Sequence, residues 1–351
     1  ALRFSLRNDN FEAVGHILDL SLTNYEKNYL IYFIAENFSY ISKENSTLTL
    51  QLEQNGIHKA LIKHLINFDF VDSTYKDTIK TLLQIAKDPE NAVFYHTILG
   101  ILDCLSLDQE LLCKRIEKLE ALNYDSNKWL IDPRSALEII YLKNKGITLA
   151  NNEVLLKIEK FKSDPFYLDN KAKEFPNVGD VLSLLLVITI NLFYGTPSEV
   201  IKICNSIAKL YPKLFTSKKP FAVYLLNLSA VAKAKIKPDP KTDQMEVILA
   251  NLMDRRHKTT TLYAQTLFQS LKAYQYKNKM EYEKALSIAY DNIEIYKRNN
   301  LTIYEISAYN LVINIFNEIG NHEMANNYTF IKMNVLDSKN VNTAPFHSTA
   351  N

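Results

Sequence analysis

The sequence predicts an all-α protein, an α-solenoid in which antiparallel helical hairpins stack into a right-handed superhelix. Glycine is scarce, with 7 among 351 residues. Because tight β-hairpins and nucleotide-binding loops need glycine, this scarcity favours helices joined by short polar turns. Most of the ten prolines lie between apolar segments, where they separate helices instead of interrupting them. Helical hairpins also recur in the C-terminal half at a spacing of about 40 residues.

The most apolar stretch, VLSLLLVITINLFYGTPSEV at 181–200, predicts the first helix of such a hairpin and the turn into the second. Its apolar part is shorter than the roughly 18 to 20 residues that a membrane helix needs. The VITI segment is β-prone, but no alternating partner run with hairpin turn chemistry lies nearby. We therefore predict a buried helix, followed by a second helix that starts at Pro197 and is ended by Pro212.

The same hairpin unit recurs three times downstream. The predicted helix pairs are 221–236 with 244–256, 260–279 with 280–299, and 302–321 with 322–339. Aligning the last two pairs places Ala285 opposite Ala325, about 40 residues apart. A recurring helical hairpin of this length is typical of an α-solenoid.

The segment NEIGNHEMANNY, and less clearly KNKMEYEKALSIAY, resembles the turn and second helix of a tetratricopeptide repeat. In that family a small residue lets the two helices approach closely, and the matching positions here are Gly320, Ala285 and Ala325. Val200, with a proline twelve residues later, also resembles the second helix of a repeat. The resemblance covers roughly 180–337. It departs from the family in its period of about 40 residues instead of 34, in Val200 itself, and in lacking the early Trp and Leu-Gly.

We predict an N-terminal helical region at 1–178, tetratricopeptide-like repeats at 179–338 and a flexible tail at 339–351. The N-terminal region has no convincing period, and we interpret it as diverged hairpins that continue the array. Its helical patterns fall at 24–41, 55–68, 73–87, 92–105, 108–122 and 134–146. The polar segment 162–180, which contains proline, is the best candidate for an internal boundary.

The cysteines and the N-terminal segment predict a cytoplasmic protein. Cys104, Cys113 and Cys204 form no C-x-x-C pair and each lies among apolar residues, so we expect small core residues, no disulfide framework and no zinc site. The start ALRFSLRNDN has no long apolar region of the signal-peptide type. It also does not begin with methionine, which leaves room for a domain upstream of Ala1.

No catalytic motif is present, so we expect a protein that is not an enzyme and has no cofactor. The sequence contains neither G-x-G-x-x-G nor G-x-x-x-x-G-K-[ST], and neither H-E-x-x-H nor G-x-S-x-G. His58 and His64 are the closest pair of histidines, and their separation places them on different helix faces. A metal site is not expected.

A block of lysines without any Asp or Glu extends from Val200 to Pro238. A basic patch of Lys213, Lys218, Lys219, Lys235 and Lys237 within it suits phosphates or an acidic partner. The alternative is a solvated basic surface divided over several helix faces.

An asparagine row marks the candidate partner-binding face. Asn310, Asn314 and Asn317 fall at i, i+4 and i+7 on one face of the predicted helix 302–321. Asparagine pairs with a peptide backbone whatever the peptide's side chains, and the tetratricopeptide resemblance implies this use. Asn227 was expected on the same inner face, with Lys233 nearby to bind a carboxylate. The alternative is that the asparagines only face water. Tyr274, Tyr290, Tyr296 and Tyr309 at helical spacing predict packing between helices.

We therefore expect a non-enzymatic protein that binds a peptide or protein partner on its concave face. A regulatory version is the sensory part of a cytoplasmic transcription regulator with an upstream DNA-binding domain, by analogy of fold with bacterial peptide-pheromone receptors. One alternative is a helical-repeat protein that binds nucleic acid through the lysine block. Another is the scaffold subunit of a larger complex. The sequence leaves a homodimer open and predicts no membrane partner.

Overall fold

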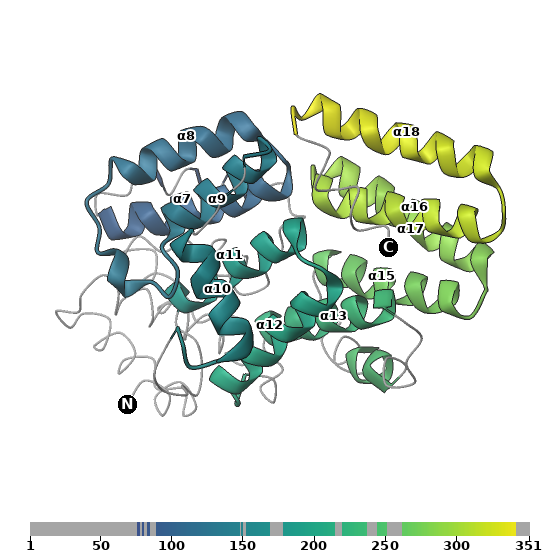
Figure 1. Ribbon diagram of the computed structural model, residues 1–351, viewed down its shortest axis with the longest axis horizontal. Coiled ribbons are helices and arrows are strands. Elements are labelled where there is room, and N and C mark those ends of the chain that lie inside the picture. The colour runs from purple at the N-terminus through teal and green to yellow at the C-terminus, as the bar shows by residue number, and fades with distance from the viewer. Residues whose placement is uncertain are drawn as a thin grey trace, which may run out of the picture.

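The protein is all-helical wherever the structure describes it, with twelve helices and no strand in those residues (Figure 1). The computed structural model describes residues 76–77, 79–80, 83–84, 89–147, 149, 152–168, 178–214, 220–236, 244–250 and 262–341. The predicted helices at 24–41 and 55–68, the boundary segment beyond residue 168 up to 177, and the tail from 342 lie outside these ranges. Residues 339–341, which we assigned to the tail, close the last helix instead.

The first part of the described chain contains helices of unequal length. They are α7 (Pro89–Leu105), α8 (Gln109–Glu120), the short 3₁₀-helix η1 (Ser126–Lys128), α9 (Pro133–Asn144), α10 (Glu153–Ser163), α11 (Val178–Tyr194) and α12 (Pro197–Leu210). Helix α10 was not predicted, although its buried Val154, Ile158 and Phe161 follow the i, i+4, i+7 pattern of an amphipathic helix. The side chain of Asn152 caps its first turn.

The described helices of the second part agree with the predicted ones to within about three residues, close to the usual scatter of helix ends. These helices are α13 (Pro220–Ile236), a helical segment at 244–250, α15 (Leu262–Asn278), α16 (Tyr282–Arg298), α17 (Thr302–Glu318) and α18 (His322–Ser338). The end of the predicted helix 244–256 lies outside the described residues. The last four helices are each 17 residues long. The predicted succession of four helices is therefore confirmed for α15 to α18.

The turns of this region repeat as regularly as its helices. A residue with a positive φ follows each of the four helices, at Met280 (62°), Asn300 (54°), Gly320 (75°) and Asn340 (52°). After each of these residues the next N–H group bonds back to the last turn, as Asn321 does to the Phe316 carbonyl at 2.9 Å. Successive turn residues are thus 20 positions apart, because 300 − 280 = 320 − 300 = 340 − 320 = 20.

The role predicted for Gly320 is wrong. No atom lies within 4 Å of the position that a Cβ would occupy there, so close approach of the helices does not require glycine. Its φ of 75° does favour glycine, since this left-handed region is costly for other residues. Ala285 and Ala325 are buried, as expected for small residues between packed helices.

The apolar stretch 181–200 forms most of α11 and the turn into α12. Residues 181–191 of α11 are all buried, so the predicted buried helix is confirmed. The backbone N–H of Thr196 donates to Glu199 Oε2 at 2.6 Å, which fixes the start of α12 together with Pro197. Among the described helices, none combines the length and the apolarity that crossing a membrane demands.

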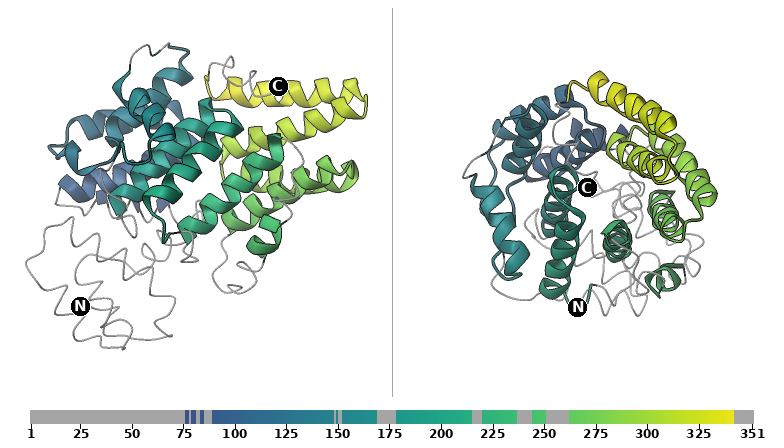
Figure 2. Two further views of the ribbon diagram at one scale, coloured as in Figure 1. Left: turned by 60° about the horizontal axis from the view of Figure 1, so that its bottom comes forward. Right: turned by 45° about the vertical axis from the view of Figure 1, so that its right-hand side comes forward.

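The helices pack in sequence order and curve back on themselves. Helices α7, α8, α9 and α11 form one group, and α12, α13, α15, α16, α17 and α18 pack each against the next. Figure 2 shows that this succession curves until α7 meets α17. Thr302 Oγ1, at the start of α17, donates to the Ser106 carbonyl at the end of α7 at 3.1 Å. This contact joins segments 196 residues apart.

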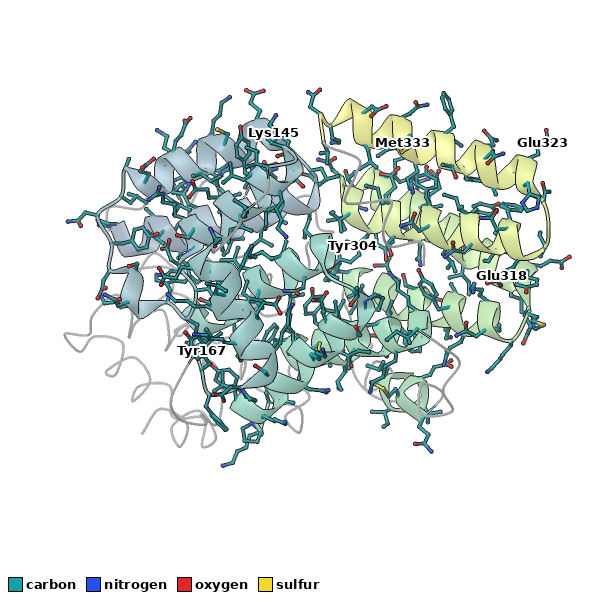
Figure 3. All side chains as sticks on the ribbon, viewed as in Figure 1. Lys145, Tyr167, Tyr304, Glu318, Glu323 and Met333 are labelled. Carbon is teal, nitrogen blue, oxygen red and sulfur yellow. The ribbon has the colours of Figure 1, made fainter. Side chains whose placement is uncertain are left out.

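A buried tyrosine cluster joins α13, α15, α16 and α17. The Tyr224 and Tyr263 rings stack with centroids 5.8 Å apart, and the Tyr263 and Tyr304 hydroxyls are 2.5 Å apart. Tyr296 packs on Tyr304 at 5.5 Å, and Figure 3 places Tyr304 near the middle of the molecule. Of the four tyrosines expected to pack between helices, Tyr274, Tyr296 and Tyr309 are buried, and Tyr290 stacks on Tyr328 at 5.9 Å.

Candidate functional site

The asparagine row lies on the accessible side of α17. Asn310 and Asn314 are half-buried and Asn317 is exposed, whereas almost every residue from Thr302 to Tyr309 is buried. Most of the first half of α17 is therefore buried, and apart from Ser307 its accessible polar side chains begin at Asn310. Asparagine side chains there can donate and accept hydrogen bonds at the same time.

Lys332 of α18 contacts the first asparagine of this row. Its Nζ donates to Asn310 Oδ1 at 3.1 Å, and the residue is only 6% exposed. Burial lowers the pKa of the Lys332 ammonium, because desolvation disfavours the charged form. Among the residues that the structure describes, no carboxylate forms an ion pair with Lys332. This lysine was not among the predicted site residues, because a single lysine in an amphipathic helix carries no distinctive pattern.

Lys235 of α13 reaches the same helix from the other side. Its Nζ donates to Ser307 Oγ at 2.9 Å and lies 5.3 Å from the ring centre of Tyr274 on α15. Ser307 precedes Asn310 by three residues and Asn314 by seven, so the three side chains share one face of α17. Helices α13, α17 and α18 therefore supply polar groups to a single surface, which we call the α17 polar face: Lys235, Ser307, Asn310, Asn314, Asn317 and Lys332.

Two residues proposed for this surface lie elsewhere. Asn227 is 0% exposed and donates to the Val223 carbonyl at 3.1 Å within its own helix, so no partner reaches it in this structure. Lys233 points to Met245 Sδ, 3.7 Å away, instead of to α17. Lys233 and Lys235 are two residues apart on α13, about 200° around the helix, and so face opposite directions. The lysine that meets the asparagine helix is Lys235.

The structure describes two lysines of the basic patch, Lys213 and Lys235. Lys213 is exposed just beyond α12, and Lys235 contacts α15 and α17. Lys218, Lys219 and Lys237 lie outside the described residues, so the patch as a whole is not placed.

The cysteines lie in the core or at its edge. Cys104 and Cys204 are buried, and burial raises the pKa of both thiols, that of Cys204 to about 12. Cys113 is half-buried, with its Sγ 3.8 Å from Glu117 Oε1. Within the described ranges, no three His, Cys, Asp or Glu side chains are placed to hold a metal ion. His58 and His64 lie outside those ranges.

A buried cluster of charges at α7 and α8 was not predicted. Asp103 is 0% exposed and accepts from Lys76 Nζ at 2.9 Å and from Arg115 Nε at 3.3 Å. Arg115 also contacts His96 Nδ1 at 3.1 Å. Burial lowers the pKa of His96 to about 4, with the charges of Arg115 and Lys118 adding to the effect. An aspartate inside the apolar run ILDCL was the only sequence signal for this cluster.

No family model matches the chain, and the searches of curated proteins and of solved structures gave no match either. The class of this protein is defined by its structure alone. It is an all-helical protein, in the residues described, whose helices pack in sequence and whose helix α17 presents a row of polar side chains. The tetratricopeptide resemblance stays a prediction from the sequence.

Proposed function

We propose that this chain is a non-enzymatic α-solenoid of the tetratricopeptide-like kind that binds an extended peptide or protein segment on its inner face. The sequential packing of α12 to α18 supports the solenoid. The equal helix lengths and the turn residues 20 positions apart support a true repeat of helical hairpins.

One observation carries the binding proposal: Lys235, Ser307, Asn310 and Lys332 converge on one face through two hydrogen bonds between helices. Neither lysine forms an ion pair with a carboxylate among the described residues. The face thus offers ammonium and amide donors together with amide acceptors, which suits the N–H, C=O and acidic groups of a peptide. Asn314 and Asn317 extend the face for about two further turns.

The proposal includes a regulatory role, in which the chain is the sensory part of a cytoplasmic regulator. Helix α17 carries both the asparagine row and Thr302, whose bond to Ser106 joins α17 to the end of α7 across the curved array. A partner bound to α17 therefore acts on the helix that holds this curvature. The array could exist with the contact between α17 and α7 formed or broken. A partner that binds one of these two arrangements more tightly would increase the population of that arrangement.

A peptide-display selection tests the binding proposal. The full chain is immobilised and a random peptide library is selected against it, with the double variant Asn314→Ala/Asn317→Ala as the counter-selection. We expect enriched peptides with dissociation constants on the order of micromolar and about tenfold weaker binding to the double variant, from the loss of about 1 to 2 kcal/mol of hydrogen bonding.

The matched control is Asn326→Ala/Asn327→Ala, which removes two exposed asparagines from α18. These residues lie outside the α17 polar face, so we expect unchanged peptide affinity. Peptides that bind the wild type and the Asn314→Ala/Asn317→Ala variant equally well would contradict the proposal, as would a selection that enriches nothing.

A further inference from the structure

We propose that the exposed face of α12 binds the phosphate backbone of double-stranded nucleic acid, independently of base sequence. The surface is a row of exposed polar and basic residues along α12 and just beyond its end, which we call the α12 basic row: Ser198, Lys202, Asn205, Lys209 and Lys213. Of these residues, only Lys213 belongs to the predicted basic patch. The row shares no residue with the α17 polar face, and Figure 1 shows α12 near the lower edge of the molecule, away from α18.

Helix geometry places the row on one side of α12. Lys202 and Lys209 are seven residues apart, so they lie on the same face, about 10 Å from each other along the helix axis. Ser198 and Asn205 precede these two lysines by four residues each and share that face. The opposite face carries the buried residues of α12 and packs against α10, α11 and α13. The row is therefore directed outward, and Lys213 is also exposed in the turn that follows the helix.

The lysines of α12 have no carboxylate beside them. The residue four positions before Lys202, and the one four positions before Lys209, is where a glutamate would form a helix ion pair, and both are neutral. Glu199 is the one carboxylate of α12, and it pairs with Lys162 of α10 at 3.0 Å. Within the part of the chain that the structure describes, neither Lys202 nor Lys209 forms an ion pair. The charge of this face is therefore uncompensated.

Other exposed helix faces in this protein pair their cations with a glutamate at the four-residue spacing. The pairs are Lys114 with Glu110 on α8, Lys157 with Glu153 on α10 and Arg298 with Glu294 on α16. Each such pair reduces the net charge of its helix face. Helix α12 differs because its exposed face presents cations alone, and a surface of one sign attracts a partner of the opposite sign.

The composition of the row favours nucleic acid over a protein or a membrane. Protein interfaces are depleted in lysine and have aromatic and apolar residues at their centre, whereas α12, which the structure describes in full, has no exposed large hydrophobic residue. A helix that binds a membrane surface likewise needs apolar side chains to insert among the lipids. Phosphate groups are contacted by lysine, serine and asparagine side chains, which are the residue types of the row.

The row also favours a duplex over a single strand. Single-stranded nucleic acids bind on aromatic side chains that stack with their bases, and α12 contains no aromatic residue. A duplex carries one negative charge per roughly 1.7 Å of its axis, so several phosphates lie within reach of lysines that are about 10 Å apart. Lysine binds phosphate as a point charge and α12 has no arginine to contact base edges. We therefore expect little dependence on base sequence.

Fluorescence anisotropy of a short labelled DNA duplex, titrated with the full chain, tests this proposal. At salt concentrations from about 50 to 200 mM, we expect dissociation constants on the order of 10⁻⁶ to 10⁻⁴ M and similar values for duplexes of unrelated sequence. The variant Lys202→Gln/Lys209→Gln/Lys213→Gln should bind at least about tenfold more weakly at the lowest salt. Its slope of log K against log salt should be smaller by about 2 to 3, because each lost phosphate contact removes about 0.9.

The matched control is Lys114→Gln/Lys118→Gln/Lys128→Gln, which removes three exposed lysines from α8 and η1 and lowers the net charge equally. These charges lie outside the row and are screened by salt, so we expect less than about threefold weaker binding. Equal losses in the two glutamine variants would show that net charge alone drives binding and would overturn the proposal. A wild type that does not bind the duplex at the lowest salt would overturn it as well.

A charge-preserving variant and two other polyanions complete the test. Lys202→Arg/Lys209→Arg/Lys213→Arg should bind the duplex like the wild type, and a loss equal to that of the glutamine variant would contradict binding through positive charge. Poly-glutamate or vesicles of anionic lipid that bind the row more tightly than the duplex would reject nucleic acid as the partner. Single-stranded DNA of the same length that binds more tightly than the duplex would reject the duplex assignment.

These outcomes are distinct from those of the peptide selection. The glutamine variant of the row should bind the selected peptides as tightly as the wild type, and Asn314→Ala/Asn317→Ala should bind the duplex as tightly as the wild type. Duplex binding that fails in the asparagine variant would place the contact on α17 and overturn this proposal. A selection that enriches no peptide would contradict the proposed function and leave the duplex measurement to decide the role of α12.

Discussion

The helices from α7 to α12 and those from α15 to α18 differ in the regularity of their lengths and of their turns. In the first region the helix lengths vary, for example 17 residues in α7, 12 in α8 and 11 in α10. In the second region every helix has 17 residues and every turn places a residue with positive φ at the same position. Figure 1 shows the two regions on opposite sides of the molecule.

The difference begins at the helix N-termini. Three helices of the first region start with a side-chain cap, as in Asp108 accepting from the Leu111 N–H at 3.0 Å and Asp132 from the Ser135 N–H at 3.0 Å. Helices α16 and α17 start at Glu281 and Leu301 without any side-chain cap bond. Helix α18 does have such a cap, since Asn321 Oδ1 accepts from the Met324 N–H at 3.1 Å. For α16 and α17, the backbone turn that ends one helix leads directly into the next helix.

The two regions also treat buried charge differently. The first region encloses Asp103 with Lys76 and Arg115, and Lys162 with two glutamates. The second region buries Lys332 against an amide alone. In the first region, buried ion pairs therefore join helices, whereas in the second region the ion pair that joins helices, Lys277 with Glu318, is more exposed.

The largest expected effect comes from breaking the buried ion cluster of the first region. Asp103→Asn leaves Lys76 and Arg115 without their carboxylate, so we expect the free energy of unfolding to fall by about 4 kcal/mol. Urea denaturation measures this change. The control is Glu110→Gln in the exposed pair with Lys114, where no measurable change is expected. Equal effects of the two substitutions would show that the buried cluster does not stabilise this region.

A second expected effect is a pH dependence that originates in the first region. His96 has a pKa of about 4 in the folded state against 6.5 in its ordinary range. Between these values the unfolded state binds more protons, so the free energy of unfolding falls as pH decreases from 6.5 to 4, by at most about 3 kcal/mol from this residue. Denaturation at a series of pH values should show that His96→Gln removes this part of the slope.

The control for that experiment is the exposed His322 at the start of α18. His322→Gln should leave the pH profile of the wild type unchanged. A profile that is the same for wild type and His96→Gln would mean that the buried imidazole is not held in its neutral form.

The smallest expected effects test the turns of the regular region. Gly320→Ala should lower the free energy of unfolding by about 1 kcal/mol through backbone strain alone, since the added Cβ meets nothing. Met280→Gly at the equivalent turn should raise it by about 0.5 kcal/mol, because Met280 already occupies the left-handed region at a φ of 62°. Effects of the same sign at both positions would show that the two turns are not equivalent.

The sequence by itself determined the local structure of this protein. The period of apolar residues predicted the described helices of the second region to within about three residues. The left-handed residue that recurs after each of these helices was not predicted. These features depend on residues close together in the chain, through helix geometry and turn chemistry. Even the missed helix α10 carried its pattern in Val154, Ile158 and Phe161.

Only the tertiary structure decided which side chains meet. The rotation of α13 against its neighbours buries Asn227 and brings Lys235 instead of Lys233 to α17. Packing of α18 on α17 creates the contact between Lys332 and Asn310, and the curvature of the whole array brings Thr302 to Ser106. These contacts depend on how helices far apart in the chain rotate and pack, and side-chain interdigitation over many helices fixes that rotation. A periodic pattern in one helix states which face is polar, but not what that face will touch.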